Sequence, residues 1–204
     1  MFGAALAELG IEVTSWDRPR GMSFEDDLRD FAEHVNGADV VGGVSYGAHL
    51  AAHLAAHGSS CDALLIALPA WIGASGSAAT LTAATGDEIA ENGIAETLRR
   101  VDRDAPAWVA REMNAAWSTY DDISLAHALH TAASAAAPTD VELRSIDTRA
   151  VVISLTNDPF HPIEVARQWS EFMPHSLLVE VDYEMGATAP DFGTAAANAL
   201  ALLL

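Results

Sequence analysis

Short apolar runs alternate along the chain with segments in which apolar residues recur at helical spacing. Continuous runs of this length are typical of buried strands, which are expected at 38–44, 63–68, 150–155 and 176–181. Residues 11–16 alternate and are rich in β-branched side chains, so a further strand is expected there. Helices are expected at 1–10, 23–37, 46–57, 162–173 and 191–204. This alternation predicts an α/β fold, with a mostly parallel sheet and helices on both faces.

The middle of the chain has a different pattern. Residues 70–144 contain no convincing strand, and helices are expected there at 86–101, 105–117 and 123–136. We therefore divide the chain into a first core part at 1–69, a helical lid at 70–144 and a second core part at 145–204. The large side chains of the lid could form an apolar acyl pocket or the lid's own core; they are Trp71, Trp108, Met113, Trp117 and Tyr120.

Composition and charge narrow the possible partners. The 204 residues include 29 acidic and 10 basic side chains, which gives a formal net charge of −19. Such a chain repels nucleic acid and anionic membrane surfaces, so neither is expected as a partner. The single cysteine, Cys61, permits no disulfide within the chain. The chain begins without a signal-peptide pattern and has no apolar stretch of ~20 residues, so a cytoplasmic location is expected.

The segment 39–48 contains a serine between two glycines, in the order Gly43-Val44-Ser45-Tyr46-Gly47. An apolar strand is expected to run directly into this motif and a helix directly out of it. A turn this sharp places the serine in strained backbone geometry, with its hydroxyl above the strand end. The backbone N–H of Tyr46 then lies at a helix N-terminus, where it can donate to a developing oxyanion. Ser45 is therefore the candidate nucleophile.

The sequence resembles the α/β-hydrolase family over nearly its whole length. The resemblance covers the 11–16 strand with its 17–21 loop, the serine motif, the lid and residues 153–162. It implies a serine hydrolase that acts on an ester or related acyl bond of a small, apolar substrate and needs no metal or organic cofactor. In that family the acid follows a late strand, and Asp158 occupies this position in the stretch 154–162. The alternative interpretation is that Asp158 only forms an Asp-Pro turn.

The general base is the point at which the sequence departs from the family. The resemblance implies a histidine after the last strand, but residues 182–191 contain none. His161, three residues after Asp158, is the leading candidate, and a carboxylate such as Asp182 or Glu184 is a second possibility. Two lid histidines, His127 and His130, are further candidates. Alternatively the site is impaired, and the chain is a hydrolase-like module that binds a small apolar ligand or a protein partner.

Two other features bear on function. His49, His53 and His57 recur at i, i+4 and i+8, but the His-Glu-x-x-His pattern is absent, so a solvated or lid-facing helix face is expected and no metal site. Members of the family begin with several strands and a His-Gly loop that supplies a second oxyanion N–H, and the resemblance places residue 1 downstream of them. A shortened sheet would have an exposed edge, which favours a homo-oligomer.

Overall fold

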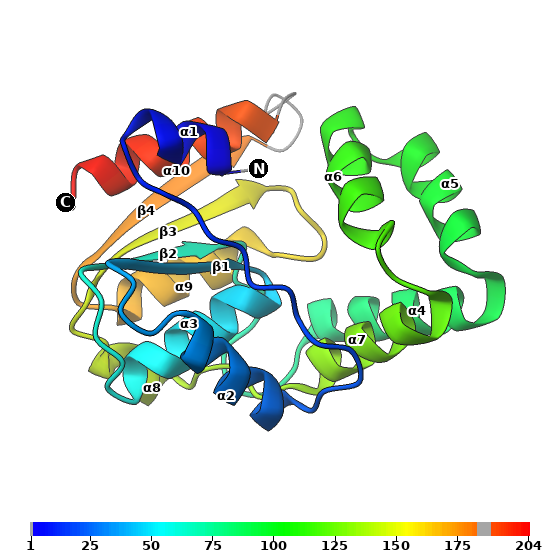
Figure 1. Ribbon diagram of the computed structural model, residues 1–204, viewed down its shortest axis with the longest axis horizontal. Helices are drawn as coiled ribbons and strands as arrows, with labels where there is room; N and C mark the ends of the chain where they lie inside the picture. Colours follow the sequence, from blue (N-terminus) through cyan, green and yellow to red (C-terminus); the bar gives the residue numbers. More distant parts are fainter. Residues whose placement is uncertain (1, 183–188) are drawn as a thin grey trace.

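A parallel four-stranded sheet forms the centre of the protein, in a computed structural model that describes residues 2–182 and 189–204 (Figure 1). The strand order follows the sequence: β1 (Val40–Val44), β2 (Ala63–Ala67), β3 (Arg149–Thr156) and β4 (Ser176–Asp182). Every residue of β2 is buried, as expected for a strand covered on both faces. The four strands expected at 38–44, 63–68, 150–155 and 176–181 are therefore confirmed, and the α/β fold class is confirmed with them.

Helices cover both faces of this sheet (Figure 1). One face carries α2 (Phe24–His34), α3 (Tyr46–Ala56), α8 (Asp140–Ser145) and α9 (Ile163–Phe172). The other face carries α1 (Gly3–Glu8) and α10 (Ala189–Ala201). On the first face the small side chains of α3, Ala48, Ala51 and Ala52, share a core with Leu64 and Ile66 of β2. These alanines let the helix that follows Ser45 lie close against the sheet.

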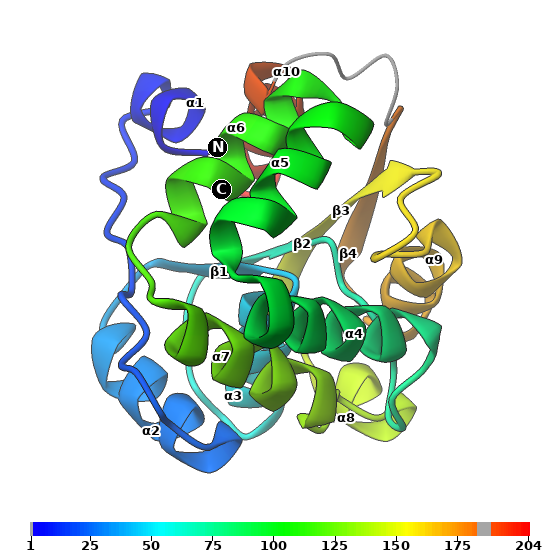
Figure 2. The same cartoon turned by 90° about the vertical axis from the view of Figure 1, so that its right-hand side faces the viewer.

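Four helices form the lid, which lies over the carboxyl ends of the strands (Figure 2). They are α4 (Ser77–Asn92), α5 (Ile94–Asp104), α6 (Ala107–Trp117) and α7 (Asp122–Ser134). Residues 70–144 contain no strand, as predicted. The single helix predicted at 86–101 is wrong, because the chain breaks at Gly93, whose φ of +82° favours glycine. Asp122 then accepts a hydrogen bond from the first N–H of α5, at Ile94.

The strand predicted at 11–16 is also wrong. These residues are irregular, and most of them are exposed. The largest side chain of residues 11–16 is that of Trp16. Its ring packs against Phe31 at 5.3 Å between centroids, and its Nε1–H donates to Asp30. Its partner is thus helix α2, and residues 11–16 add no strand beside β1. β1 therefore forms an edge of the described sheet, while the oligomer expected from such an edge stays a prediction.

None of the described helices is both long and apolar enough to cross a bilayer.

Candidate active site

The serine motif forms a sharp turn between β1 and α3. Ser45 has φ 55° and ψ −113°, a conformation that a non-glycine residue adopts only at a cost of about 1–3 kcal/mol. A Cβ on Gly43 would lie 2.1 Å from the carbonyl carbon of Gly47, so only glycine fits there. A Cβ on Gly47 would meet no atom within 4 Å. The Ser45 N–H donates to the carbonyl of Ala67 over 2.8 Å, which ties the strained turn to the neighbouring strand β2.

A short loop between β3 and α9 carries both an acid and a histidine. Its first residue, Asn157, has φ +63°, which turns the chain out of β3. Asp158 Oδ1 accepts the N–H of Phe160 at 2.8 Å, and Asp158 Oδ2 lies 2.8 Å from His161 Nδ1. Pro162 then caps α9. The two interpretations of Asp158 are therefore compatible, since one oxygen forms the Asp-Pro turn and the other holds the histidine.

The imidazole of His161 connects this loop to the serine. Its Nε2 lies 2.9 Å from Ser45 Oγ. Because a carboxylate only accepts hydrogen bonds, Nδ1 carries a proton toward Asp158, which leaves Nε2 to accept the proton of the serine hydroxyl. Burial alone would raise the pKa of Asp158, but the hydrogen bond and charge of His161 and the nearby backbone N–H groups hold it below its usual value. Asp158 is thus an ionised carboxylate at neutral pH.

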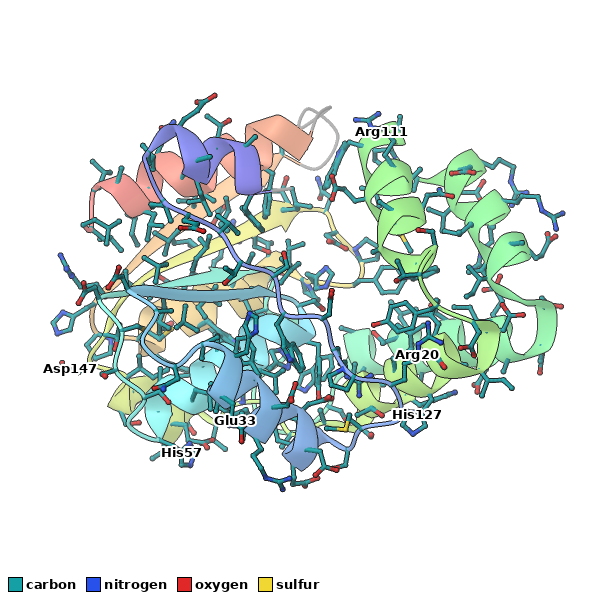
Figure 3. All side chains as sticks on the ribbon, viewed as in Figure 1. Arg20, Glu33, His57, Arg111, His127 and Asp147 are labelled. Carbon is teal, nitrogen blue, oxygen red and sulfur yellow. The ribbon has the colours of Figure 1, made fainter. Side chains whose placement is uncertain are left out.

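The structure brings together the three predicted residues, and their catalytic role stays a prediction. The other candidates for the base lie elsewhere or outside the described residues. Asp182 is the last residue of β4 and is not among the described residues that line the cavity over Ser45. Glu184 lies outside the described part of the chain. In the lid, His127 is exposed and contacts Thr131 (Figure 3), and His130 lies 3.3 Å from Asp87.

Tyr46, the predicted oxyanion donor, is the first residue of α3, so its N–H has no partner within the helix. Its hydroxyl donates to Asp27 Oδ2 at 2.7 Å, and Arg18 forms an ion pair with the same buried carboxylate. Burial, together with this acceptor, raises the pKa of the Tyr46 phenol. The sequence analysis missed this support. The sequence shows the charged loop 17–21 and the acidic first turn of α2. It does not show that Arg18 of the loop and Asp27 of α2 form a pair that contacts the Tyr46 hydroxyl.

A cavity of about 670 Å³ opens above Ser45, between the core and the lid. Its floor includes Leu155, Phe160 and His161. The side chains of α6 that line it are mostly apolar, whereas those of α5 are mostly polar. Among the large lid residues, Trp108, Met113 and Trp117 line it. Trp71 instead contacts the ring of His49, and Tyr120 packs in a separate lid core. Trp117 both lines the cavity and packs in that lid core. A role of the cavity as an acyl pocket stays a prediction.

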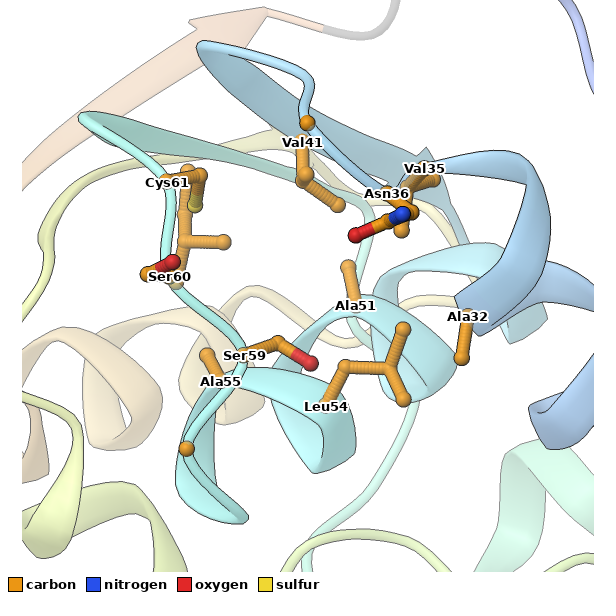
Figure 4. Close-up of a pocket in the computed structure, with 13 residues that line it drawn as sticks. Ala32, Val35, Asn36, Val41, Ala51, Leu54, Ala55, Ser59, Ser60 and Cys61 are labelled. Carbon is orange, nitrogen blue, oxygen red and sulfur yellow. The ribbon is translucent and has the colours of Figure 1, made fainter.

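A second cavity, of about 330 Å³, lies between α2, α3 and the amino ends of β1 and β2 (Figure 4). It contains the thiol of Cys61 and the hydroxyls of Ser59 and Ser60. Burial raises the pKa of the Cys61 thiol, so it stays protonated and weakly nucleophilic. This cavity therefore offers no counterpart to the serine, histidine and aspartate of the first.

The histidine face of α3 is not solvated as expected. His49 is fully buried, accepts the N–H of Ala70 at its Nε2 over 3.2 Å, and stacks on Trp169. Burial, with smaller contributions from neighbouring histidines, lowers the pKa of His49 to about 3, so the ring is neutral. His53 is also buried, and only His57 is exposed. Of the two predicted environments, the solvated face is wrong, because α8 and α9 pack over it. The lid-facing alternative agrees with the contacts of His49 and His53 to Ala70 and Ala136, which lie within residues 70–144.

The comparisons with known proteins agree with this architecture. No protein-family model matches the sequence, and no curated protein matches it as a relative. Solved structures do match. A thermophilic esterase from Thermogutta terrifontis has a TM-score of 0.69 at 16% identity, over 99% of this chain and 85% of that one. The enol-lactonase from Burkholderia xenovorans has a TM-score of 0.70 at 17% identity, over 91% and 76%.

A third solved structure, described as an alpha/beta hydrolase from Sphaerobacter thermophilus, has a TM-score of 0.57 at 23% identity, over 98% of this chain and 85% of that one. Identities at this level reflect a shared fold. The parallel sheet with helices on both faces agrees with these matches, which cover more than nine-tenths of this chain. The chain therefore has the α/β-hydrolase fold.

Proposed function

We propose that this protein is a serine hydrolase that cleaves an ester or related acyl bond through an acyl-enzyme at Ser45. One observation carries the proposal: the hydrogen-bonded series from Asp158 to His161 to Ser45, with distances of 2.8 and 2.9 Å. A nucleophile, a base within hydrogen-bond reach and a third group that orients the base are the three parts that acyl transfer requires. The strained turn adds to this, because it exposes the hydroxyl to the cavity.

The reaction would proceed in two displacements. As Ser45 Oγ attacks the acyl carbon, its proton passes to His161 Nε2, and Asp158 stabilises the resulting imidazolium. The N–H of Tyr46 donates to the oxyanion that forms. His161 then gives the proton to the departing alkoxide, which leaves as an alcohol. Water, deprotonated by the same nitrogen, attacks the acyl-enzyme and releases the acid and free Ser45.

The cavity supports a neutral, apolar acyl group as the substrate class. Its lid walls offer aromatic and thioether side chains at Trp108, Met113 and Trp117, and its volume lies in the range of small-molecule sites. Charged side chains of both signs also line it, namely Asp104, Glu112 and Arg100. The wall therefore does not select the charge of the substrate by itself, and the preference for a neutral acyl group rests on the apolar side chains and on the formal net charge of −19 of the whole chain.

The alternative is a hydrolase-like module that binds a small apolar ligand or a protein partner without turnover. It is favoured by the oxyanion site, where Tyr46 supplies one N–H and the family resemblance implies two. Loss of one such donor costs about 10²–10³-fold in rate. A slow enzyme and a binding module therefore differ chiefly in whether Ser45 is nucleophilic.

A fluorophosphonate probe separates the two functions. We expect it to label the purified protein covalently, and we expect Ser45→Ala and His161→Ala to remove most of the labelling. His175→Ala is the matched control, because His175 also faces a carboxylate, Asp147 at 3.2 Å, but at the start of β4. Labelling that is negligible in the unaltered protein, or equal in Ser45→Ala, would overturn the proposal in favour of the binding module.

A further inference from the structure

Three potential metal ligands converge at the end of α3 that lies away from Ser45. They are His53 and His57 of α3 and Glu142 of α8. Glu142 Oε1 lies 3.5 Å from His53 Nδ1 and 3.9 Å from His57 Nε2. Ser45 caps the other end of the same helix, roughly 18 Å away at 1.5 Å per residue. Among residues 2–182 and 189–204, no other group of three such side chains converges in this way.

The hydrogen bonds around these rings fix where their protons lie. His53 Nε2 is 3.0 Å from the carbonyl oxygen of Ala136, and His57 Nδ1 is 2.8 Å from the carbonyl oxygen of His53. A carbonyl only accepts, so in each neutral ring the nitrogen beside the carbonyl carries the hydrogen. The opposite nitrogens, His53 Nδ1 and His57 Nε2, then present lone pairs toward the carboxylate.

Hydrogen bonds also fix the position of the Glu142 carboxylate. Its Oε2 accepts the N–H and the hydroxyl of Thr139, both at 2.8 Å, in a capping box at the start of α8. The other oxygen, Oε1, is an acceptor that faces two further acceptors, His53 Nδ1 and His57 Nε2. Three lone pairs that face one another favour a cation between them, either a proton or a metal ion.

We propose that His53, His57 and Glu142 bind a divalent transition-metal ion, with zinc as the best match, that links α3 to α8. Zinc takes imidazole nitrogens and carboxylate oxygens at about 2.0–2.2 Å in tetrahedral geometry, which sets neighbouring ligand atoms about 3.4 Å apart. The three ligand atoms already lie within 4.8 Å of one another. Water completes the coordination on the side where His57 is exposed.

The surroundings match those of a metal site. Each histidine donates its other ring N–H to a backbone carbonyl, and the carboxylate is itself hydrogen-bonded, the arrangement that orients ligands and raises their basicity. The ring of Phe24 lies edge-on to His53 at 5.4 Å between centroids and shields one side. Figure 3 shows His57 at the surface, where an ion can enter. The ion would link α3, the helix that follows Ser45, to α8.

The test is zinc titration of chelator-stripped full-length protein at pH 7.5, against a chromophoric chelator and by thermal melting. We expect one bound zinc per chain and a raised Tm on binding. Glu142→Gln keeps an acceptor for the capping box, and His57→Ala removes an exposed ring. Each should weaken binding by at least ~10-fold, whereas His175→Ala should not change it.

Cobalt supplies a second readout, since Co²⁺ in the same site should give the intense visible absorption of a four-coordinate ion. The proposal is overturned if zinc leaves the Tm unchanged, because the site then holds only protons. It is equally overturned if Glu142→Gln and His57→Ala bind zinc as tightly as the unaltered protein, because binding is then adventitious. Neither outcome bears on labelling of Ser45, so the two proposals fail independently.

Discussion

Replacement of Asp158 by asparagine tests the link between acid and base directly. Asparagine has the same shape, so its carbonyl can still accept the N–H of Phe160 that closes the turn. Its NH₂ group, however, donates toward His161 Nδ1, where the aspartate accepted. The imidazole must then carry its proton on Nε2, the nitrogen 2.9 Å from Ser45 Oγ. In that tautomer it cannot accept the serine proton.

The expected loss follows from this change of tautomer. The same substitution in a serine protease with an equivalent relay lowers kcat by about 10⁴-fold. At about 1.36 kcal/mol for each factor of ten, this corresponds to roughly 5.4 kcal/mol of transition-state stabilisation. Because the turn is retained, we expect the fold and the affinity for a reversible apolar ligand to stay nearly constant. The effect should therefore lie in the rate of acylation.

The assay is the second-order rate constant for fluorophosphonate labelling, measured beside the hydrolysis of a neutral p-nitrophenyl ester. Asp147→Asn is the matched control, because Asp147 is exposed and faces His175 in the same way. If Asp158→Asn is labelled within about tenfold of the unaltered protein, which is far short of the full tautomer effect, Asp158 does not orient the base. If Asp147→Asn is impaired to the same degree, the loss is one of stability.

Further predictions concern the framework around the serine. Gly43→Ala should lower the free energy of unfolding by more than about 4 kcal/mol, because its Cβ would lie 2.1 Å from the backbone of Gly47. Gly47→Ala should change it by less than about 1 kcal/mol, and equal urea midpoints for the two variants would contradict this account. Asp27→Asn should cost about 3 kcal/mol, since it breaks the buried pair with Arg18 and alters the acceptor of Tyr46. A loss below about 1 kcal/mol, the size of a surface ion pair, would show that this pair is not needed.

The two central strands, β2 and β3, could be predicted because they are buried on both faces and are continuous apolar runs in the sequence. The outer strands, β1 and β4, are only partly buried and were recognised from their short, largely apolar sequences. The segment 11–16 could not be predicted, because alternation shows that one side of a segment is covered but not by what. Trp16 is covered by helix α2. The break between α4 and α5 at Gly93 could not be predicted either, because a single glycine is tolerated within a helix. Only its positive φ in the structure shows that one helix ends and another begins there.

The candidate site also has parts that could be predicted from the sequence and parts that could not. The serine turn and the Asp158 loop are local, so their residues lie close together in the sequence. The choice of His161 over the other bases depends on the distance between two segments, which spacing alone does not give. The cluster of His53, His57 and Glu142 was missed because its carboxylate comes from α8, beyond the lid, while the sequence pattern showed only the histidines on α3.

The loop that follows β3 has a consequence for how the site assembles. Asp158 and His161 are three residues apart, and their hydrogen bond needs only the conformation of that loop. The bond from His161 to Ser45 spans 116 residues. The geometry of the pair thus depends on one loop, whereas its contact with the serine depends on β3 lying beside β2 and β2 beside β1. Grafting this loop into another hydrolase scaffold would transfer Asp158 and His161 together. The graft would then need only one long-range distance to be right, the one between the histidine and the serine of the new scaffold.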